Sequence, residues 1–282
     1  MKYYIVDAFT SEPFGGNPAG VVLLKRGCDF PSDRLMTQIA AEFRYSETAF
    51  VRHDAAREFT VRYFTPCSEV DLCGHATIAT FGTLRRTGIV PQGSVCLNHT
   101  LAGDLEVRVD QQVMMQMATP RVIPATIDIA QLHRIMAGDA AVFTTRLPVE
   151  IVSTGLPDIM MPIDSVEALN QMRPDMDALA ALSDLHGVTG VHAFAFGDDG
   201  YTAHVRNFGP LYGVPEESAT GTANAALTHY LLRHGIIDAE AHNRFLQGEA
   251  MQRPSVVATS VIDGIIYVGG DSRIIAHGTL TL

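Results

Sequence analysis

Residues 61–77 read VRYFTPCSEVDLCGHAT, and residues 205–223 read VRNFGPLYGVPEESATGTA. The first six positions of the two stretches lie 144 residues apart (205 − 61) and are identical in four places. Each stretch then reaches a helix-like segment that starts at a glycine, Gly74 or Gly221, at an offset of 147 (221 − 74). A pattern that recurs at a nearly fixed offset indicates an internal repeat.

Two further matches keep the same order along the chain. Residues 84–88 (LRRTG) correspond to residues 231–235 (LLRHG), and residues 100–104 (TLAGD) correspond to residues 245–249 (FLQGE). Four matches in one order predict that the chain consists of two homologous halves. We expect these halves to cover residues 1–120 and 121–282, and the last strand can return to the first half.

Short runs rich in β-branched and aromatic residues, bounded by Gly, Pro and Asp, predict strands. In the first half these runs are residues 3–9, 20–24, 48–52 and 59–64. Residues 32–43 carry apolar side chains at a spacing of four and predict an amphipathic outer helix, with Ser32 or Asp33 as its cap. Residues 192–206 alternate around the turn GDDG and predict a hairpin.

Residues 74–86 and 221–233 are small or apolar almost all round. Each segment closes with basic residues and then Gly88 or Gly235, which is typical of a helix end. A helix without a polar face is buried. We therefore predict an α+β fold in which each half is an antiparallel, barrel-like sheet wrapped around one central helix.

Gly74 and Gly221 each follow an acidic, turn-rich loop at the expected start of a buried helix. The first N–H groups of a helix lack internal partners and attract anions, and glycine lets a ligand approach closely. If the halves face each other, both helix starts contribute to one cleft that binds a small carboxylate. The alternative is that both glycines only permit tight helix packing.

Glu47 is the position where the two halves differ in a chemically important way. At the offset of 144 residues it corresponds to Val191 (191 − 47), so one half has a carboxylate where the other has an aliphatic side chain. In an apolar cleft such a carboxylate could have a raised pKa and exchange a proton with carbon. The alternative is an ordinary solvated residue at the start of a strand.

Composition excludes several classes of function. The formal charge is −11, which opposes nucleic-acid binding. Four cysteines without a CxxC pair indicate neither a zinc site nor a disulfide scaffold, so we expect a cytoplasmic protein without a metal. No apolar run reaches the length of a membrane helix, the N-terminal residues lack the pattern of a signal peptide, and no phosphate-binding or dinucleotide motif is present. We expect no cofactor.

The motifs resemble those of the PhzF-like proteins, a family of phenazine-biosynthesis isomerases and relatives with the diaminopimelate-epimerase fold. The matching segments are IVDAFTSEPFGGNPAGVV (5–22), YSETAFV (45–51), FTPCSEVDLCGHAT (64–77), FGPLYGVPEESATGTA (208–223) and LQGEAMQRPS (246–255). The resemblance implies two pseudo-symmetric halves, each a barrel around a central helix, and a homodimer. It also implies that Glu47 is the acid/base that moves a proton between substrate carbons, and that His75 lies beside it.

The resemblance is incomplete at positions that contact the substrate. The family carries an aspartate and a serine there, and this chain carries Glu217 and Thr222. Both differences argue against the phenazine precursor, dihydro-hydroxyanthranilate, as the substrate. Related racemases use two cysteines, and this chain has Cys73 at the first position but Thr220 at the second, so two-cysteine racemisation is not expected.

We therefore predict a cofactor-independent isomerase or epimerase that acts on a small amino- or hydroxy-carboxylate. In this hypothesis Glu47 moves the proton, while Gly74, His75, Gly221 and Thr222 hold the carboxylate. Glu217 is predicted to hold an amino or hydroxyl group. The alternative is a binding protein on the same scaffold that holds a small carboxylate without turnover. His75 could also be only a satisfied residue in the first turn of its helix, and Cys73 only a packing residue.

Overall fold

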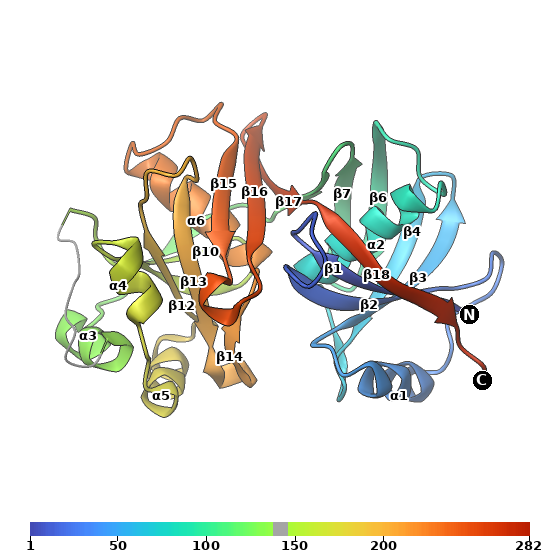
Figure 1. Ribbon diagram of the computed structural model, residues 1–282, viewed down its shortest axis with the longest axis horizontal. Coiled ribbons are helices and arrows are strands. Elements are labelled where there is room, and N and C mark those ends of the chain that lie inside the picture. Colours follow the sequence, from blue (N-terminus) through green and yellow to red (C-terminus); the bar gives the residue numbers. More distant parts are fainter. Residues whose placement is uncertain (138–145) are drawn as a thin grey trace. The chain divides into compact units, whose positions relative to one another are not determined.

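The computed structural model describes residues 1–137 and 146–282 and divides the chain into two compact units. Unit 1 consists of Met1–Gln116 and Gly269–Leu282, and unit 2 is Met117–Val268. The end of the chain therefore belongs to the first unit, where the C-terminal strand pairs with the N-terminal one (Figure 1).

Unit 1 surrounds a central helix with strands from both ends of the chain. Its strands are β1 (Lys2–Ala8), β2 (Asn17–Leu23), β3 (Thr48–Ala55), β4 (Glu58–Phe64), β5 (Glu69–Val70), β6 (Ser94–Thr100), β7 (Gly103–Val109), β8 (Val113–Gln116) and β18 (Ser272–Thr279), and its helices are α1 (Asp33–Phe43) and α2 (Gly74–Arg86). Helix α2 contacts β1, β2, β3, β7, β8 and β18. Residues 75–84 of this helix are all buried, which confirms the prediction of a helix without a polar face.

Unit 2 repeats this plan with additional helices. Its strands are β9 (Arg121–Ile123), β10 (Glu150–Ser153), β11 (Pro157–Pro162), β12 (Gly190–Ala195), β13 (Ala203–Gly209), β14 (Val214–Glu217), β15 (Asn243–Gln247) and β16 (Ser255–Ile262). Its helices are α3 (Ile129–Ala137), α4 (Val166–Gln171), α5 (Met176–His186) and α6 (Gly221–Arg233). Helix α6 contacts β10, β11 and β16. Strand β17 (Ile265–Gly270) leads from unit 2 back to unit 1.

The sheets, predicted to be antiparallel, also contain parallel strand pairs. Strands β2 and β3 are parallel, as are β4 and β6, β11 and β12, and β13 and β15. Parallel neighbours need a crossover, and a helix lies in the chain between the members of each pair. Helices α2 and α6 are themselves such crossovers, and this connection places the start of each one directly after a strand and a short loop.

Local sequence signals agree with the structure at the outer elements. The predicted helix over residues 32–43 is confirmed as α1, where the Ser32 side chain accepts a hydrogen bond from the Leu35 N–H group. The predicted hairpin is confirmed as the antiparallel pair β12 and β13. In unit 1, an apolar cluster that includes Met36 of α1 and Phe50 of β3 attaches this outer helix to the sheet.

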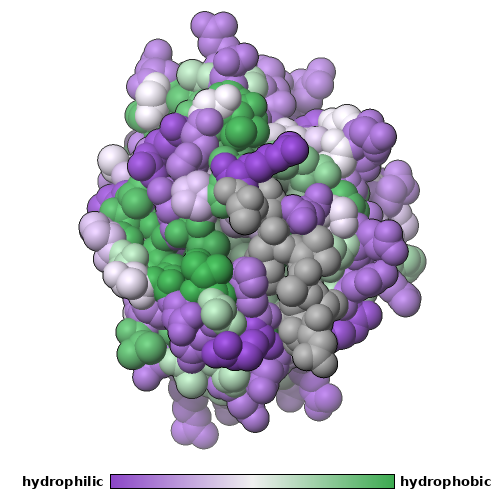
Figure 2. Space-filling model, turned by 90° about the vertical axis from the view of Figure 1, so that its left-hand side faces the viewer, coloured by the Kyte–Doolittle hydropathy of each residue, from purple (hydrophilic) through white to green (hydrophobic). Residues whose placement is uncertain are grey.

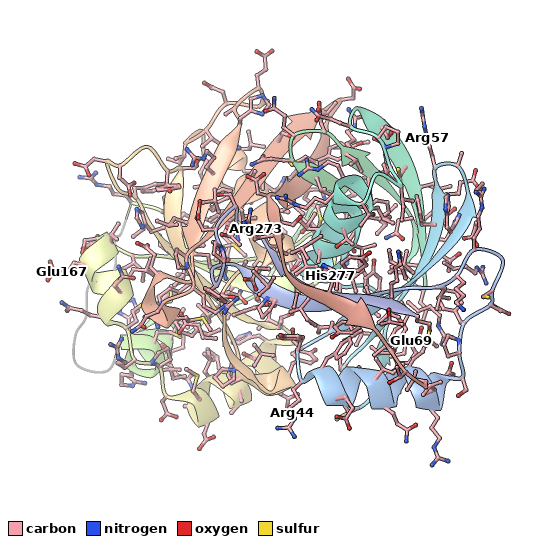
Figure 3. All side chains as sticks on the ribbon, turned by 45° about the vertical axis from the view of Figure 1, so that its right-hand side comes forward. Arg44, Arg57, Glu69, Glu167, Arg273 and His277 are labelled. Carbon is pink, nitrogen blue, oxygen red and sulfur yellow. The ribbon has the colours of Figure 1, made fainter. Side chains whose placement is uncertain are left out.

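Apolar and charged side chains share the surface. Figure 2 shows apolar patches among hydrophilic residues on the face presented by unit 2. Charged side chains such as Arg44 and Glu167 are exposed and point away from the ribbon (Figure 3). Among the described residues, no helix is both long and apolar enough to span a membrane.

Candidate active site

Glu47 and His75 come together in unit 1. Glu47 directly precedes strand β3, and His75 is the second residue of helix α2. The Glu47 Oε2 atom lies 3.2 Å from the His75 Nε2 atom, and the side chains of Glu47 and His75 are 20% and 5% exposed. The pair is thus largely shielded from water, which strengthens charge and hydrogen-bond interactions within it.

The Oε2 atom of Glu47 is buried and, within residues 1–137 and 146–282, has no hydrogen bond of good geometry. This oxygen lies close enough to His75 Nε2 for an ion pair, but the two groups do not have the geometry of a hydrogen bond. Leaving a buried polar atom without a partner costs about 1–3 kcal/mol. Such an atom in a native protein calls for an explanation, and a catalytic group that awaits a ligand is one.

Two further polar side chains surround the imidazole of His75. The Ser46 Oγ atom lies 3.3 Å from His75 Nε2, and the buried Cys73 Sγ atom lies 3.4 Å from His75 Nδ1. One donor atom from each of Glu47, Cys73 and His75 lies within 4.8 Å of the other two. Cys73 and Glu47 lie nearest to opposite ring nitrogens of His75, so the imidazole stands between the thiol and the carboxylate.

The start of helix α2 has no side-chain cap and is not tightly packed at Gly74. Its N-cap residue, Cys73, makes no side-chain capping hydrogen bond. A Cβ atom built on Gly74 would meet only the Met115 Cε atom, at an ordinary contact distance of 3.8 Å. Protein packing therefore does not require glycine at position 74, which argues against the alternative that this glycine only permits tight packing.

In unit 2, Glu217 and the loop before α6 are held by a glutamine from strand β15. The Thr220 hydroxyl donates to Glu217 Oε2 over 2.6 Å. Gln247 accepts from the Thr220 N–H group over 3.0 Å and donates to the Glu217 carbonyl over 2.8 Å. These bonds fix both the backbone and the carboxylate of the loop, so Glu217 is preorganised.

Gly221 and Thr222 are the first two residues of α6, as Gly74 and His75 are of α2. The N-cap residue of α6, Thr220, makes no side-chain capping bond to the helix. The Thr154 hydroxyl donates to the Thr222 carbonyl over 2.9 Å and ties the first turn to the end of strand β10. Thr222 itself is partly exposed.

Comparison with known proteins decides the family. The sequence profile of the family PhzC-PhzF, described as phenazine biosynthesis-like protein, matches residues 6–278. The chain belongs to this family.

Similar proteins of the family are isomerases by name. The chain is 33% identical over 289 residues to the uncharacterized isomerase YfhB of Bacillus subtilis, covering 99% of this chain and 94% of the relative. It is 30% identical over 295 residues to the trans-2,3-dihydro-3-hydroxyanthranilate isomerase of Pseudomonas chlororaphis, with 99% of both chains covered. The crystal structure of a PhzF family protein from Bacillus anthracis is similar over 100% of this chain and 99% of that chain, with a TM-score of 0.88 and 24% identity. The resemblance to PhzF-like proteins is thus confirmed, as is the prediction that the chain is an isomerase.

The structure places the predicted residues of this PhzF-like isomerase in two groups. Glu47, Gly74 and His75 lie together in unit 1, and Glu217, Gly221 and Thr222 flank or start α6 in unit 2. The roles assigned to them from the sequence stay predictions.

Sequence reasoning missed two residues that organise these groups in the PhzF-like fold. Ser46 contacts His75, and Gln247 holds the loop between Glu217 and Thr220. Both lie in segments that carry the family resemblance, YSETAFV and LQGEAMQRPS. The sequence carried a signal for both residues. Ser46 directly precedes the predicted site residue Glu47, and Gln247 directly precedes Gly248, which belongs to the internal repeat.

Sequence reasoning also missed a buried polar chain in unit 2. Asp158 of β11 is 1% exposed, and burial raises its pKa to about 7, with the charge of Glu217 adding to the shift and a hydrogen bond with Asn207 opposing it. Asn207 Nδ2 lies 3.3 Å from His192 Nδ1, and burial lowers the pKa of His192 to about 3. Both titratable groups are therefore held neutral near pH 6.

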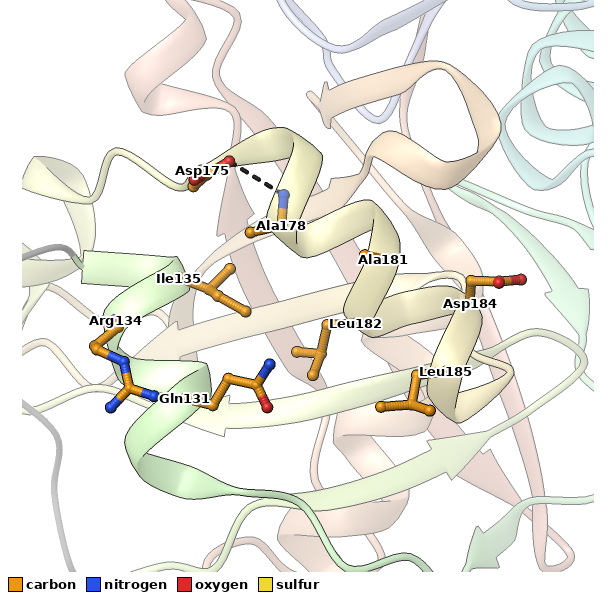
Figure 4. Close-up of a pocket in the computed structure, with 9 residues that line it drawn as sticks. All are labelled: Gln131, Arg134, Ile135, Asp175, Ala178, Ala181, Leu182, Asp184 and Leu185. Atoms are coloured by element: carbon orange, nitrogen blue, oxygen red, sulfur yellow. Dashed lines mark hydrogen bonds between the residues drawn. The ribbon is translucent and has the colours of Figure 1, made fainter.

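A hollow of about 700 Å³ lies elsewhere in unit 2, between α3 and α5 (Figure 4). Its lining includes Ile135 of α3 and Leu182 and Leu185 of α5, and the Asp175 side chain accepts a hydrogen bond from Ala178 N–H at its rim. None of the residues that line it belongs to the predicted site.

Proposed function

We propose that this PhzF-like isomerase moves a proton between carbons, or between faces of one carbon, of a small amino- or hydroxy-carboxylate, with Glu47 as the general acid/base. The observation that carries the proposal is the distance of 3.2 Å between Glu47 Oε2 and His75 Nε2, since this oxygen has no hydrogen-bond partner among the described residues. A positioned general acid/base contributes about 10²–10⁴-fold to a rate.

In the first step the Glu47 carboxylate takes a proton from a carbon next to an electron-withdrawing group. The electrons of the broken C–H bond delocalise into that group. The carboxylic acid then returns a proton to another carbon, or to the other face of the same carbon, and the enzyme regains its initial state. The reaction is balanced without an electron acceptor, so the proposed mechanism uses no cofactor.

His75 and Ser46 support this proton transfer. The imidazole lies 3.2 Å from the Glu47 carboxylate, and a small rotation of either side chain would let it donate a hydrogen bond that orients the oxygen facing the substrate. The Ser46 hydroxyl lies 3.3 Å from the same nitrogen and restrains the ring. The position of Cys73 on the other side of the imidazole makes the ring part of a fixed group of side chains.

The open helix starts support the binding of a carboxylate. Neither α2 nor α6 has a side-chain cap, and both are 13 residues long, so the first N–H groups of each helix can bind an anion. Glu217 supplies a fixed negative charge that suits a substrate amine. We propose that Gly74 at the start of α2, and Gly221 and Thr222 at the start of α6, bind a carboxylate, and that Glu217 binds an amino or hydroxyl group.

The related enzyme from Pseudomonas chlororaphis is named for trans-2,3-dihydro-3-hydroxyanthranilate, which is an amino-carboxylate. We propose a substrate of the same class but of different shape, because this chain has Glu217 and Thr222 where the family motif has shorter side chains. The added methylene and methyl groups change both the reach of the carboxylate and the space beside it.

The test is incubation of the protein with amino-cyclohexadiene carboxylates and amino acids in D2O, followed by NMR. Incorporation of deuterium at carbon, with formation of an isomer, is the result the proposal predicts. Calorimetric binding of a compound that never exchanges hydrogen would instead favour the binding protein that the sequence left open as an alternative.

A further inference from the structure

Asp158 is a buried acid of unit 2 that the proposed proton transfer does not use. We propose that Asp158 is a positioning residue for Glu217 and that it releases its proton when a cationic amino group binds to Glu217. This inference rests on the role proposed for Glu217 and deepens it, because the site then responds to an amino group and not to a hydroxyl group.

The strand register places Asp158 and Glu217 on the same face of the sheet in unit 2. Asn207 of β13 lies directly opposite Glu217 of β14 and directly opposite His192 of β12, and opposed residues share one face. Asp158 of β11 is aligned with Gly190, two residues before His192, and so shares that face. Because Gly190 has no side chain, Asp158 can reach across β12 to Asn207, with which it shares a hydrogen bond.

A chain of polar side chains also joins Asp158 to Glu217 through the interior of unit 2. In order from Asp158, the members that lie next to one another are Asn207, His192, Asn224, Gln247 and Thr220. The Gln247 amide donates to Thr220 Oγ1 over 3.0 Å, and the hydroxyl hydrogen of Thr220 is thereby left for Glu217 Oε2, 2.6 Å away. The orientation of the Glu217 carboxylate therefore depends on side chains that reach back to Asp158.

The surroundings of Asp158 favour its neutral form. The residue is 1% exposed, and its Oδ1 atom has no hydrogen-bond partner within residues 1–137 and 146–282. Burial, together with the negative charge of Glu217, raises the pKa of Asp158 to about 7. Loss of the proton would place an incompletely bonded, buried charge near another charge of the same sign, which is costly.

Other titratable groups on the elements around Asp158 are neutral or paired. Burial lowers the pKa of His192 on β12 and of His229 on α6, so both imidazoles are neutral at pH 7. The charged groups on β10, β13, β14 and α6 form ion pairs, which are Arg206 with Glu216 and Arg233 with Glu150. A cationic ligand at Glu217 would therefore add a new positive charge to this environment.

Binding of an ammonium group changes the balance at Asp158. A positive charge next to Glu217 lowers the cost of a second carboxylate. The O–H bond of Asp158 then breaks, its electron pair stays on the carboxylate, and the proton passes to solvent. A neutral hydroxyl group adds no charge and leaves the proton in place. By linkage, loss of the proton at higher pH strengthens the binding of the amine.

The first test uses the full chain without a ligand, with the proton as its probe. Carbon-13 NMR of aspartate-labelled protein follows the ionisation of Asp158, whose signal is the one missing from Asp158→Asn. We expect the midpoint to move to lower pH by about half a unit or more in Glu217→Gln, because a neighbouring negative charge is removed. The matched control is Glu167→Gln, at an exposed glutamate of the same unit, which should leave the midpoint unchanged.

The second test compares two ligands by calorimetry in buffers of different ionisation enthalpy. The ligands are the amino form of the compound that exchanges hydrogen in D2O and its analogue with a hydroxyl group in place of the amine. At pH 7 we expect Asp158 to release up to about half a proton per bound amine, since a group with a pKa of about 7 is half protonated there. The hydroxyl analogue should release none from this source. Asp158→Asn should abolish the difference between the ligands, whereas Asp184→Asn, at an exposed aspartate of α5, should keep it.

The two tests separate this inference from the proposed function. An unshifted midpoint in a folded Glu217→Gln variant overturns the coupling, and this measurement needs no isomerase activity. Equal proton release with both ligands on the wild-type chain overturns the response to an amine, even if a variant does not fold. A difference that persists in folded Asp158→Asn overturns the assignment to Asp158. Deuterium exchange without either effect overturns the inference and leaves the proposed function standing.

Discussion

Asp158 and His192 are buried in the same polar chain, and their contributions to stability depend on pH in opposite directions. Because the pKa of Asp158 is raised to about 7, the native state keeps a proton that the unfolded chain releases, and stability falls as pH rises from about 4 to 7. Because the pKa of His192 is lowered to about 3, the unfolded chain binds a proton that the native state lacks, and stability falls as pH drops below about 6.5.

Replacing Asp158 with Asn removes one of these opposing effects. We expect Asp158→Asn to stabilise the protein by up to about 4 kcal/mol at about pH 8 and by clearly less at about pH 5, since the penalty for ionising the carboxyl grows with pH. Urea unfolding at both pH values measures this difference. A gain of equal size at both would contradict a raised pKa for Asp158.

Glu217 allows a prediction about specificity. Glu217→Asp shortens the side chain and removes the bond from the Thr220 hydroxyl, so we expect kcat/KM for the native substrate to fall by about tenfold or more. The double variant Glu217→Asp/Thr222→Ser restores the family motif, and it should gain activity on trans-2,3-dihydro-3-hydroxyanthranilate. Steady-state kinetics with both compounds measure the change, and unchanged kcat/KM in the single variant would show that Glu217 does not touch the substrate.

Helix α2 carries two glycines that the structure treats differently. A Cβ on Gly74 fits, whereas a Cβ on Gly82 would overlap Ser272 of β18. We expect Gly74→Ala to leave stability within about 1 kcal/mol of wild type but to weaken carboxylate binding, because the methyl group occupies the approach to the helix start.

Gly82→Ala is the matched comparison within the same helix. It should lose about 1–3 kcal/mol of stability through overpacking. Thermal unfolding and ligand calorimetry on both variants separate the two effects. If Gly74→Ala binds the ligand as tightly as wild type, the start of α2 is not a binding site.

Elements with a strong local signal could be predicted from the sequence. The bounds 74–86 and 221–233 agree with α2 and α6, because a run of small and apolar residues between a glycine start and a basic end has few other interpretations. Strand direction could not be predicted in this way. The parallel pairing of β2 with β3 depends on how α1 returns the chain, which is a property of tertiary packing.

The candidate site was predictable only where a motif marks it. Glu47 and His75 stand in short motifs, and the structure brings them together. Asp158 stands in a strand of otherwise apolar residues, PDIMMP, and its burial depends on neighbours from β12 and β13. Gln247 directly precedes the repeat position Gly248, so its motif marks the residue, but its bonds run to a loop that is distant in sequence and no local pattern indicates those partners.

At the scale of the whole molecule, the two units repeat one plan and differ in their chemistry. Each has a long buried helix without a side-chain cap, and the loop or turn at its start carries polar groups. Unit 1 supplies a carboxylate next to an imidazole, whereas unit 2 supplies a carboxylate held by Thr220. We interpret the first as the group that moves the proton and the second as a group that orients the substrate.

The initial rate of deuterium incorporation at substrate carbon, compared between wild type and Glu47→Gln in D2O, tests the central claim most directly. The substrate is the compound that exchanges with the wild-type chain, and Glu42→Gln, at an exposed glutamate of α1, is the control. We predict a loss of at least about 100-fold in Glu47→Gln and a wild-type rate in Glu42→Gln. A folded Glu47→Gln variant that incorporates deuterium at the wild-type rate would contradict the account.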